Sequence, residues 1–388
     1  MPQLTYRTAG ESHGRALVVL IEGMPSGLPV DLDLVNAELR RRQGGFGRGG
    51  RMRIEQDAAV ILGGVRRGVA IGSPLVMQIE NRDFRIDEAP PVRRPRPGHA
   101  DLAGSLKWLT TDCRETLERA SARETAARVA AGALAKSLLR EFGVQCVGFV
   151  LEIGGVRANA PPDAPPEALA AARDANDVYT PDAAAVAGMI EAIQEAKRAK
   201  DTVGGIVEVR VFNLLPGLGS CFSWQQKLDG RLMQAVGSIQ AFKGVEIGLG
   251  FESARRRGSD VHDAIYYDAA QRDTSSFGFV RRTNNAGGLE GGMTNGQALV
   301  VRGAMKPIST LLRGMDSVNL ETLAPQRSDY ERSDICAVPA ASVVAENVVA
   351  FQVAAAFMDK FAGDSLRETR AAYEHYTAAA RRLGGQPE

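Results

Sequence analysis

Apolar residues recur along the chain in short runs that are typical of β-strands. One of them is "RALVVLIE" at residues 15–22, which is rich in valine, leucine and isoleucine. Runs of this kind predict strands over residues 15–22, 58–62, 74–80, 144–153, 205–212 and 298–301.

An alanine-rich segment, "SARETAARVAAGALAKSLLREFG", predicts one long helix. The helix is expected to begin at Arg114 or Ser121 and to run through Arg140. Ser121 and Glu124 fit a capping box, and Gly143 is a plausible stop. Further helices are expected over residues 32–42 (with Asp31 or Asp33 as N-cap), 184–200, 225–239 and 342–361.

Glycine, proline and asparagine mark the segments between these elements. We expect a Gly/Arg loop at 40–53, a stiff extended connection at 90–97, a Pro/Ala-rich surface excursion at 159–175 and an irregular Gly/Asn-rich segment at 283–297. No repeat and no clear interdomain linker is visible, so the chain is expected to form one α+β or α/β domain.

The composition predicts a soluble protein with a substantial core. The chain has 388 residues, of which 44% are hydrophobic. No apolar run is expected to be long enough to cross a bilayer, and the N-terminus lacks a charged-then-apolar signal pattern. We therefore expect a cytoplasmic protein with no membrane partner. The four cysteines are isolated from one another, so neither a metal site nor a disulfide scaffold is expected.

The basic residues are more informative than the net charge of +1, which selects neither nucleic acid nor membrane. Of the 47 basic residues, 39 are arginine, whose fork binds phosphate and carboxylate. "RRRQGGFGRGGRMR" (residues 40–53) combines six arginines with five glycines, which let backbone N–H groups approach an anion. We interpret it as a loop for a phosphorylated ligand. The alternative, an RGG-like nucleic-acid segment, is disfavoured by the helix before it and by the near-zero net charge.

Two of the four histidines lie in similar surroundings. His13 lies between small residues in "AGESHGRAL", and an arginine follows it. His99 follows a glycine in "RPGHADL", with Arg96 and Asp101 close by. A lone histidine in a loop is more often structural, but this repeated setting indicates a shared site with acid–base chemistry.

Other stretches carry groups suited to anions or to proton transfer. Ser121 at a helix N-terminus and Lys306 in "AMKPIST" are suited to anions. Arg332 and Asp334 lie just ahead of a helix, either as a surface pair or with Asp334 as a positioned base in a cleft. From the residues alone we predict an enzyme for a phosphorylated, multiply anionic substrate, with the reaction left open.

The motifs together resemble those of the chorismate synthase family. They run in the family's order from residue 9 to about 346, which is most of the chain, and as a set they are specific. The matching segments are "AGESHGRAL", "RRQGGFGRGGRM", "RPGHADLAG", "LERASARETAARVAAGALA", "DTVGGIVEV", "IQAFKGVEIG", "NNAGGLEGGMTNGQ", "MKPIST" and "RSDICAVPAASVVAE".

The resemblance implies a fold, a reaction and a cofactor. The family fold is a β-α-β sandwich of antiparallel sheets with helices between them, here one domain over residues 1–388, assembled as a homotetramer. The family forms chorismate from 5-enolpyruvylshikimate 3-phosphate by 1,4-anti elimination of phosphate, the last step of the shikimate pathway of aromatic amino acid biosynthesis. It requires reduced FMN without net redox change. No flavin-reductase segment is visible, so we expect a monofunctional lyase supplied with reduced flavin from outside, with NADPH at most an indirect reductant.

The resemblance also implies roles for individual residues. His13 matches the histidine that protonates the departing phosphate, His99 the histidine near the flavin N1–C2=O edge, and Asp334 the carboxylate linked to proton removal through flavin N5. Substrate contacts are implied for Ser12, Arg42, Arg48, Arg96, Arg123 and Arg332. FMN contacts are implied for Arg119, Ala120, Ser121, Gln240, Ala241, Gly291, Lys306, Pro307, Ile308, Ser309, Thr310 and Arg332. Arg42 and Arg48 also match positions assigned to NADPH contact.

Two other functions compete with this hypothesis. A flavin oxidoreductase acting on an anionic substrate would consume NADPH with each product formed. An RNA-binding module using residues 40–53 would bind long polyanions with strong salt dependence. That second hypothesis leaves His13, His99 and Asp334 unexplained.

Overall fold

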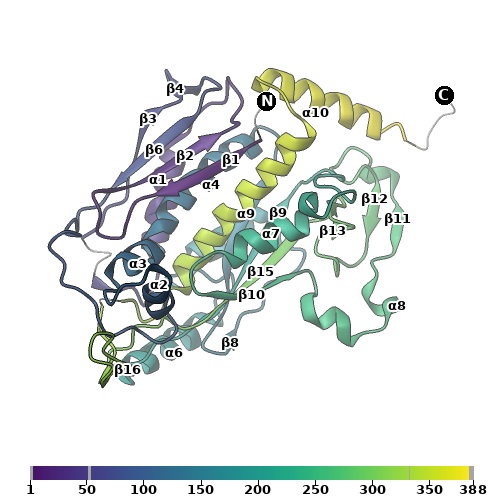
Figure 1. The fold of residues 1–388 in the computed structure, drawn as a ribbon. Coiled ribbons are helices and arrows are strands. Elements are labelled where there is room, and N and C mark those ends of the chain that lie inside the picture. The colour runs from purple at the N-terminus through teal and green to yellow at the C-terminus, as the bar shows by residue number, and fades with distance from the viewer. Residues whose placement is uncertain (1–2, 51–53, 332, 384–388) are drawn as a thin grey trace.

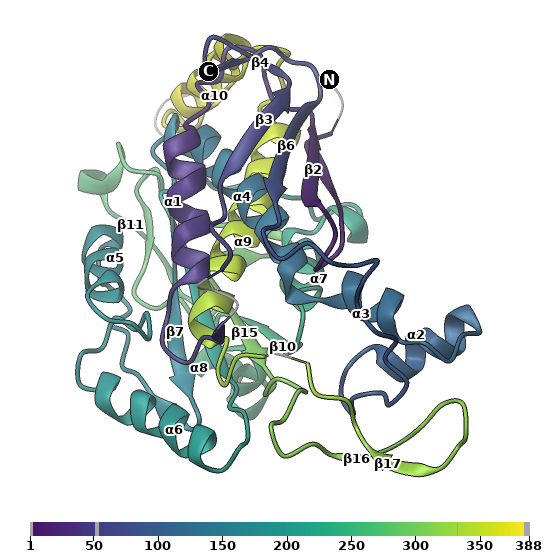
Figure 2. The same ribbon diagram turned by 90° about the vertical axis from the view of Figure 1, so that its left-hand side faces the viewer.

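Two antiparallel sheets enclose a layer of helices (Figures 1 and 2). The computed structural model describes residues 3–50, 54–331 and 333–383. The first sheet consists, in spatial order, of β1 (Thr5–Ala9), β2 (Ala16–Glu22), β6 (Leu75–Glu80) and β3 (Ala59–Gly63). The second consists of β10 (Phe242–Ile247), β15 (Leu299–Met305), β9 (Gly205–Phe212), β7 (Gln145–Ile153) and β8 (Val156–Arg157).

The inner layer is formed by α1 (Leu32–Gln43), α4 (Thr125–Arg140) and α9 (Val338–Lys360). α4 packs against β2 and β6, whereas α9 packs against β7 and β9, so each sheet has its own helical cover. α4 and α9 approach closely at Gly132, where an added Cβ would lie 2.2 Å from the carbonyl oxygen of Asn347. This β-α-β layering confirms the sandwich of antiparallel sheets that the resemblance implied.

The first sheet shows why the hydrophobic pattern predicts its strands. Along β2, buried and half-exposed residues alternate, and Leu17, Val19 and Ile21 face the core. β2 pairs antiparallel with β6 in a register that places Leu17 opposite Ile79 and Val19 opposite Met77. Because side chains on a strand alternate between its two faces, this register directs both apolar sets to the same helices.

α9 is the most apolar element of the chain. It is long and apolar enough to cross a membrane by length and composition, so the expectation that no such run exists was wrong. Its most apolar window is 94% buried inside the fold, between the other helices and the second sheet. A helix that is apolar all round needs such burial, and this one finds it in the protein core.

Shorter elements surround the sandwich. The helices are α2 (Asp101–Trp108), α3 (Arg114–Ala120), α5 (Pro166–Asp174), α6 (Val186–Arg198), α7 (Leu228–Gly237), α8 (Gly258–Val261) and α10 (Leu366–Ala380). The hairpins pair β4 (Val65–Arg66) with β5 (Val69–Ala70), β11 (Ile265–Tyr267) with β12 (Phe279–Arg281), β13 (Leu289–Glu290) with β14 (Met293–Thr294), and β16 (Asp316–Val318) with β17 (Pro325–Arg327). Figure 2 shows α2 and the β16–β17 hairpin extending from one end of the sandwich.

The strands and most helices predicted from the sequence are confirmed to within a few residues. Asp31 is the N-cap of α1, since its side chain accepts a hydrogen bond from the backbone N–H of Leu34. The excursion at 159–175 contains a helix, α5, and the segment at 283–297 contains the short β13–β14 hairpin. The hydrophobic pattern did not predict β1, β10, α2 or α10.

The expected single helix from Arg114 or Ser121 to Arg140 is wrong as one piece. α3 ends at Ala120, Ser121 has an extended backbone with ψ 142°, and a 3-10 turn over residues 122–124 precedes α4. Helix propensity is a local preference, and tertiary contacts override it at this point.

The expected capping box at the same place is also wrong. The Ser121 side chain accepts from the backbone N–H of Arg123 and not from that of Glu124. The Glu124 carboxylate instead accepts hydrogen bonds from Arg128 and Gln240. The break brings Ser121 and Arg123 together on the wall of one cavity.

Candidate active site

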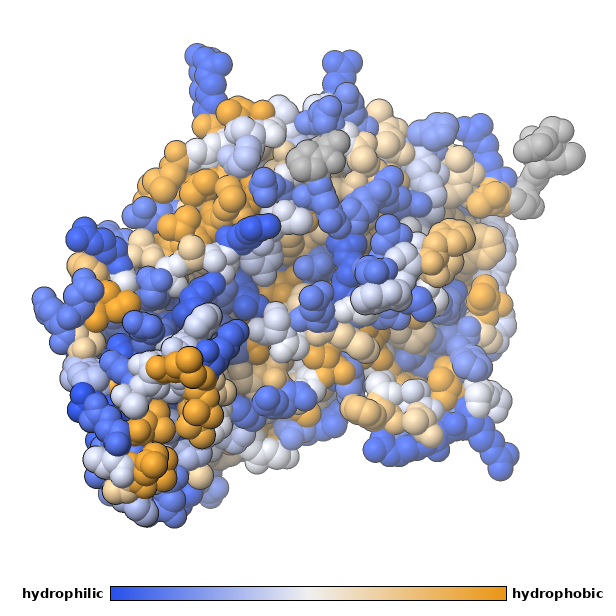
Figure 3. Space-filling model, viewed as in Figure 1, coloured by the Kyte–Doolittle hydropathy of each residue, from blue (hydrophilic) through white to orange (hydrophobic). Residues whose placement is uncertain are grey.

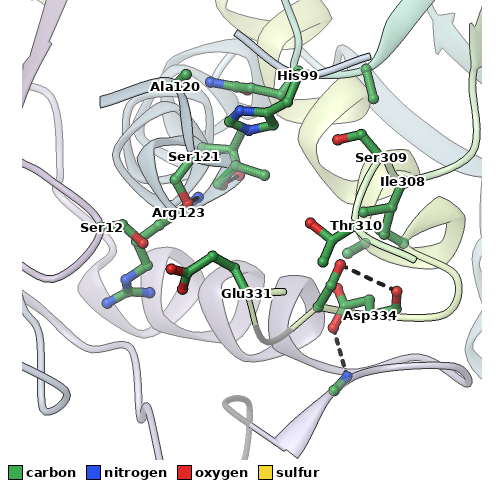
Figure 4. Close-up of a pocket in the computed structure, with 18 of the residues that line it drawn as sticks. Ser12, His99, Ala120, Ser121, Arg123, Ile308, Ser309, Thr310, Glu331 and Asp334 are labelled. Carbon is green, nitrogen blue, oxygen red and sulfur yellow. Dashed lines mark hydrogen bonds between the residues drawn. The ribbon is translucent and has the colours of Figure 1, made fainter. Parts of the chain in front are cut away.

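A cavity of about 690 Å³ lies where segments far apart in the sequence meet. Its walls come from the loop after β1, the end of α1, the loop before α2, the break between α3 and α4, the start of β10, the segment after β15 and the start of α9. Figure 4 shows Ser12 and Ser121 on one side of it and Ser309 and Asp334 on the opposite side.

Basic side chains dominate the polar part of the wall. Among the residues that the structure describes, seven cationic side chains line the cavity against three carboxylates. The cations are Arg42, Arg48, Arg85, Arg96, Arg123, Lys243 and Lys306, and the carboxylates are Asp83, Glu331 and Asp334. A concave wall of this sign attracts a ligand that carries several negative charges.

Another part of the wall is apolar. The side chains at the start of α9 are mostly alanines, and larger apolar side chains from other segments line the rest of this part of the wall. The apolar residues include Leu117, Ile239, Phe242, Met305, Ile308, Ala337, Ala340, Ala341 and Val344. An apolar strip beside a cationic wall suits a ligand with a flat ring system and an anionic end.

His13 lies in the loop between β1 and β2 and is held by α3. Its Nδ1 lies 2.9 Å from Oε1 of Glu118, and its backbone N–H donates to Oε2 of the same carboxylate at 2.7 Å. Its Nε2 lies 3.7 Å from Oδ2 of Asp83 on the cavity wall. The ring is buried, with the Glu118 carboxylate within hydrogen-bond distance of Nδ1 and the Asp83 carboxylate farther away near Nε2.

His99 and Arg96 share one buried carboxylate. Asp101, the first residue of α2, contacts Nδ1 of His99 and accepts from Nε of Arg96 at 2.8 Å. Arg96 also donates to Oγ1 of Thr310 at 3.0 Å, which ties the loop to the segment after β15. Burial raises the pKa of Asp101, but the hydrogen bonds from His99 and Arg96 lower it by more. The pKa is therefore below its ordinary value, and the group stays a carboxylate.

Arg42 and Arg123 are joined by a carboxylate behind the wall. Arg42 donates to Oδ2 of Asp57 at 3.3 Å, and Arg123 donates to Oδ1 at 2.5 Å. Arg42 also donates to Thr125 and to the carbonyl of Ala122. Burial lowers the pKa of Arg42 to about 9, with Asp57 raising it and Arg123 lowering it. Two buried guanidinium groups this close make the wall favourable for a further anion.

Asp334 lies just ahead of α9, across the cavity from Ser12 and Ser121 (Figure 4). Its Oδ2 accepts from Nη1 of Arg48 at 2.6 Å, and its Oδ1 accepts from the backbone N–H of Gly49 at 2.6 Å. The Gly/Arg loop therefore holds this carboxylate from two directions. A Cβ at Gly49 would lie 2.8 Å from the carbonyl oxygen of Ser333, so a larger residue would disturb the contact.

Two lysines and a glutamine form a further polar corner. Burial lowers the pKa of Lys306, and the charge of Lys243 lowers it further. Both lysines line the cavity. Gln240 donates to Glu124 at 3.1 Å, while its buried Oε1 accepts no hydrogen bond within the described structure. An anionic group that also offers a donor would satisfy all three side chains.

A family model described as chorismate synthase matches residues 4–358. The chain belongs to the chorismate synthase family. The chorismate synthase of Pelobacter propionicus is 52% identical over 394 residues, covering 98% of this chain and 100% of that protein. That of Geobacter sulfurreducens is 52% identical over 386 residues, covering 96% of this chain and 98% of the relative. A crystal structure of a chorismate synthase matches with a TM-score of 0.81 and 39% identity, over 99% of this chain and 100% of the other.

Most of the residues that the resemblance to chorismate synthases singled out do meet in the cavity. They come from segments separated by hundreds of positions and nevertheless share one wall. The predicted residues that line it are Ser12, His13, Arg42, Arg48, Arg96, His99, Ala120, Ser121, Arg123, Gln240, Ala241, Lys306, Ile308, Ser309, Thr310 and Asp334.

Among the described residues, three of the implied flavin contacts are not part of this wall. Arg119 instead donates to the carbonyls of Thr8 and Gly10. Gly291 lies in the β13–β14 turn, where an added Cβ would meet nothing within 4 Å, and Pro307 is exposed and is not among the lining residues. Arg332 lies outside the described residues. All four assignments stay predictions, and the cavity of a single chain does not support those of Arg119, Gly291 and Pro307.

The residues that sequence reasoning missed are mostly counter-charges. Glu118 and Lys243 lie inside matched segments but were given no role, and Asp57 lies in no matched segment. Asp101 was noted only as a neighbour of His99. Glu118 lies 105 positions from His13, and Asp57 lies 66 from Arg123. No local pattern signals such pairings, because folding alone brings the partners together.

Proposed function

We propose that this protein is a chorismate synthase in activity: it eliminates phosphate from 5-enolpyruvylshikimate 3-phosphate to give chorismate, with reduced FMN and no net redox change. The observation that carries the proposal is the convergence of His13, His99 and Asp334 on one cation-rich cavity in a chain of this family. Family membership places the chain among lyases of aromatic biosynthesis.

The chemistry of the substrate suits the charge of the wall. The substrate carries a phosphate and two carboxylates, and each charge-assisted hydrogen bond contributes about 1.5–3 kcal/mol. In the elimination, the C–O bond to the phosphate breaks with its electron pair on phosphate, a ring C–H bond loses its hydrogen, and a C=C bond forms. The wall must therefore bind three anionic groups and supply a proton donor at the departing oxygen.

The residues divide these tasks. His13 would donate a proton from Nε2 to the departing phosphate, beside the Ser12 hydroxyl. Arg42, Arg48, Arg96 and Arg123 would bind the anionic groups of the substrate, as inferred from their places on the wall. A positioned general acid typically accelerates such a step ~10²–10⁴-fold.

Two other residues of the cavity wall would handle the ring hydrogen and the flavin edge. Asp334, held by Arg48 and Gly49, would take part in removing the ring hydrogen. His99, backed by Asp101, would stabilise negative charge at the flavin edge. Both side chains are fixed by partners before any ligand binds, which reduces the cost of organising the site.

The cavity residues fit a reduced flavin mononucleotide. The apolar strip at the start of α9 suits an isoalloxazine ring, and Lys306, Lys243 and Ser121 suit its phosphate. The buried Oε1 of Gln240 offers an acceptor for a flavin N–H or ribityl hydroxyl. When bound, reduced FMN would supply electron density to the reacting ring and a basic site at N5. Arg48 and the fully engaged Arg42 are better explained by this cavity than by a separate NADPH site.

We further infer a monofunctional cytoplasmic homotetramer that takes reduced FMN from another source, with NADPH as an indirect reductant. The family resemblance is the basis for these statements. An exposed apolar surface supports the assembly: Val60 and Leu62 of β3 are 57% and 58% exposed. Figure 3 shows apolar side chains gathered over the first sheet, and contiguous patches of this kind mark interfaces.

The test is anaerobic phosphate release from 5-enolpyruvylshikimate 3-phosphate with and without chemically reduced FMN. We expect release only with reduced FMN and over many turnovers per flavin. Release in proportion to flavin oxidation would make the protein an oxidoreductase. No release from folded protein that binds both ligands would refute the proposed activity.

A further inference from the structure

The contacts of His13 give a function to Glu118, which does not line the cavity. The Glu118 side chain is fully buried, and its carboxylate accepts from the backbone N–H of His13 at 2.7 Å. Its oxygens lie 2.9 and 3.1 Å from Nδ1 of the ring. The carbonyl of Glu118 also accepts from the backbone N–H of Ser12 at 3.0 Å. One residue of α3 thus holds both the backbone and the ring of the candidate acid.

The protonation of Glu118 determines which ring nitrogen of His13 can donate to a ligand. Burial raises the pKa of Glu118. The hydrogen bonds from His13 and the charges of His13 and Arg114 lower it by more, so the pKa is below its ordinary value. At neutral pH the group is a carboxylate, which only accepts hydrogen bonds. Nδ1 must then carry a hydrogen in both the neutral and the cationic ring, so the transferable proton is the one on Nε2.

We propose that Glu118 is the positioning residue for His13, fixing the Nδ1–H form of the imidazole so that Nε2 alone exchanges its proton with a ligand in the cavity. This inference rests on the proposed function, in which His13 is the proton donor. It extends that function by naming the group that selects the donating nitrogen.

Other charges near the ring are compatible with this arrangement. On the cavity side, Asp83 lies 3.7 Å from Nε2 and is itself paired with Arg85 at 3.1 Å. Behind the ring, Arg114 lies 3.4 Å from Glu118 and donates to Glu331 at 3.0 Å. Glu118 is thus the carboxylate in hydrogen-bond contact with Nδ1, while Asp83 is too distant from Nε2 for a direct hydrogen bond.

His99 also has a fully buried carboxylate beside its Nδ1, that of Asp101. There, however, Nη2 of Arg96 lies 3.0 Å from the same ring nitrogen, and Asp101 is shared with Arg96. At His13 the Nδ1 faces the Glu118 carboxylate, which also accepts from the His13 backbone, so the tautomer argument applies to His13.

The first test uses the unaltered protein. Side-chain ¹⁵N–¹H spectra distinguish the two neutral tautomers, and the chain has only four histidines, so a His13→Gln variant assigns the signals of interest. We expect neutral His13 to carry its hydrogen on Nδ1. A neutral ring protonated on Nε2 would overturn the proposal, whatever the activity.

The second test uses matched variants of α3. Glu118→Gln keeps the shape but cannot accept from both the backbone and the ring, so we expect kcat to fall about 100-fold, as for loss of a positioned general acid. KM should stay within about twofold, since binding groups are untouched. Glu115→Gln, the same change on the exposed side of the helix, should behave as wild type.

The outcomes separate this proposal from the proposed function. No phosphate release by the wild type would refute the activity and leave the tautomer measurement valid. Active wild type with an equally active, folded Glu118→Gln variant would refute the positioning role. If the glutamine variant does not fold, Glu118→Asp, which keeps the charge on a shorter side chain, should retain the Nδ1–H tautomer with reduced kcat; the opposite tautomer in that variant would also contradict the proposal.

Discussion

Asp57→Asn is the substitution whose effect on stability follows most directly from the structure. Asp57 is the carboxylate shared by Arg42 and Arg123, and all three side chains are at most 5% exposed. Asparagine keeps the shape and one acceptor but removes the negative charge. Two guanidinium groups would then face each other with their common counter-ion gone.

The magnitude can be estimated from the cost of an unpaired buried charge. Removing one partner of a buried ion pair destabilises a protein by about 3–5 kcal/mol. The unfolding entropy near 60 °C corresponds to roughly 0.8 kcal/mol/K for a chain of this length. We therefore expect Tm to fall by about 4–6 °C.

Thermal unfolding followed by circular dichroism checks this value. Inorganic phosphate at millimolar concentration should raise the Tm of Asp57→Asn more than that of wild type, because the anion replaces the missing charge. Asp87→Asn, on an exposed residue, serves as the matched control and should leave Tm unchanged. An unchanged Tm for Asp57→Asn would show that the two arginines do not need their shared carboxylate, and the account of the wall would be wrong.

Three further predictions concern the site and its surroundings. His13→Ala should slow phosphate release by about 10² or more while leaving FMN affinity nearly intact, measured by anaerobic stopped flow and flavin titration; lost flavin affinity with unchanged chemistry would contradict its role. Cys221 is exposed, whereas burial raises the pKa of the other three thiols. A thiol reagent at neutral pH should therefore modify one cysteine per native chain quickly, and rapid modification of two cysteines would contradict this prediction. Burial raises the pKa of Glu38, but the charges of Lys136 and Arg41 lower it by more, so that it lies well below its ordinary value of 4.5. Its stabilisation is complete above that value and is lost as pH falls towards the folded-state pKa, so the urea midpoint should drop between about pH 5 and pH 3, and a flat profile would count against it.

Much of the fold could be predicted because its signals are local. The alternation of Leu17, Val19 and Ile21 along β2 is visible in the sequence, and so are the two N-cap candidates, Asp31 and Asp33, of which the structure uses Asp31. The break at Ser121 was not predicted, since the residues around it favour a helix by themselves. The layering of two antiparallel sheets around helices also had no local signal and came into the prediction through the family resemblance. The order of the strands within each sheet was not predicted.

The candidate site divides in the same way. Residues that carry a recognisable motif, such as His13, His99 and Asp334, could be found in the sequence because their types and neighbours indicate chemistry. Their partners could not, because Glu118 and Asp57 are ordinary acidic residues until folding places them beside His13 and Arg123. The cation-rich composition and the motif residues are properties of the sequence by itself. Which nitrogen of His13 faces a ligand, and which charges are neutralised before one binds, depend on contacts across the core, and only the tertiary structure decides them.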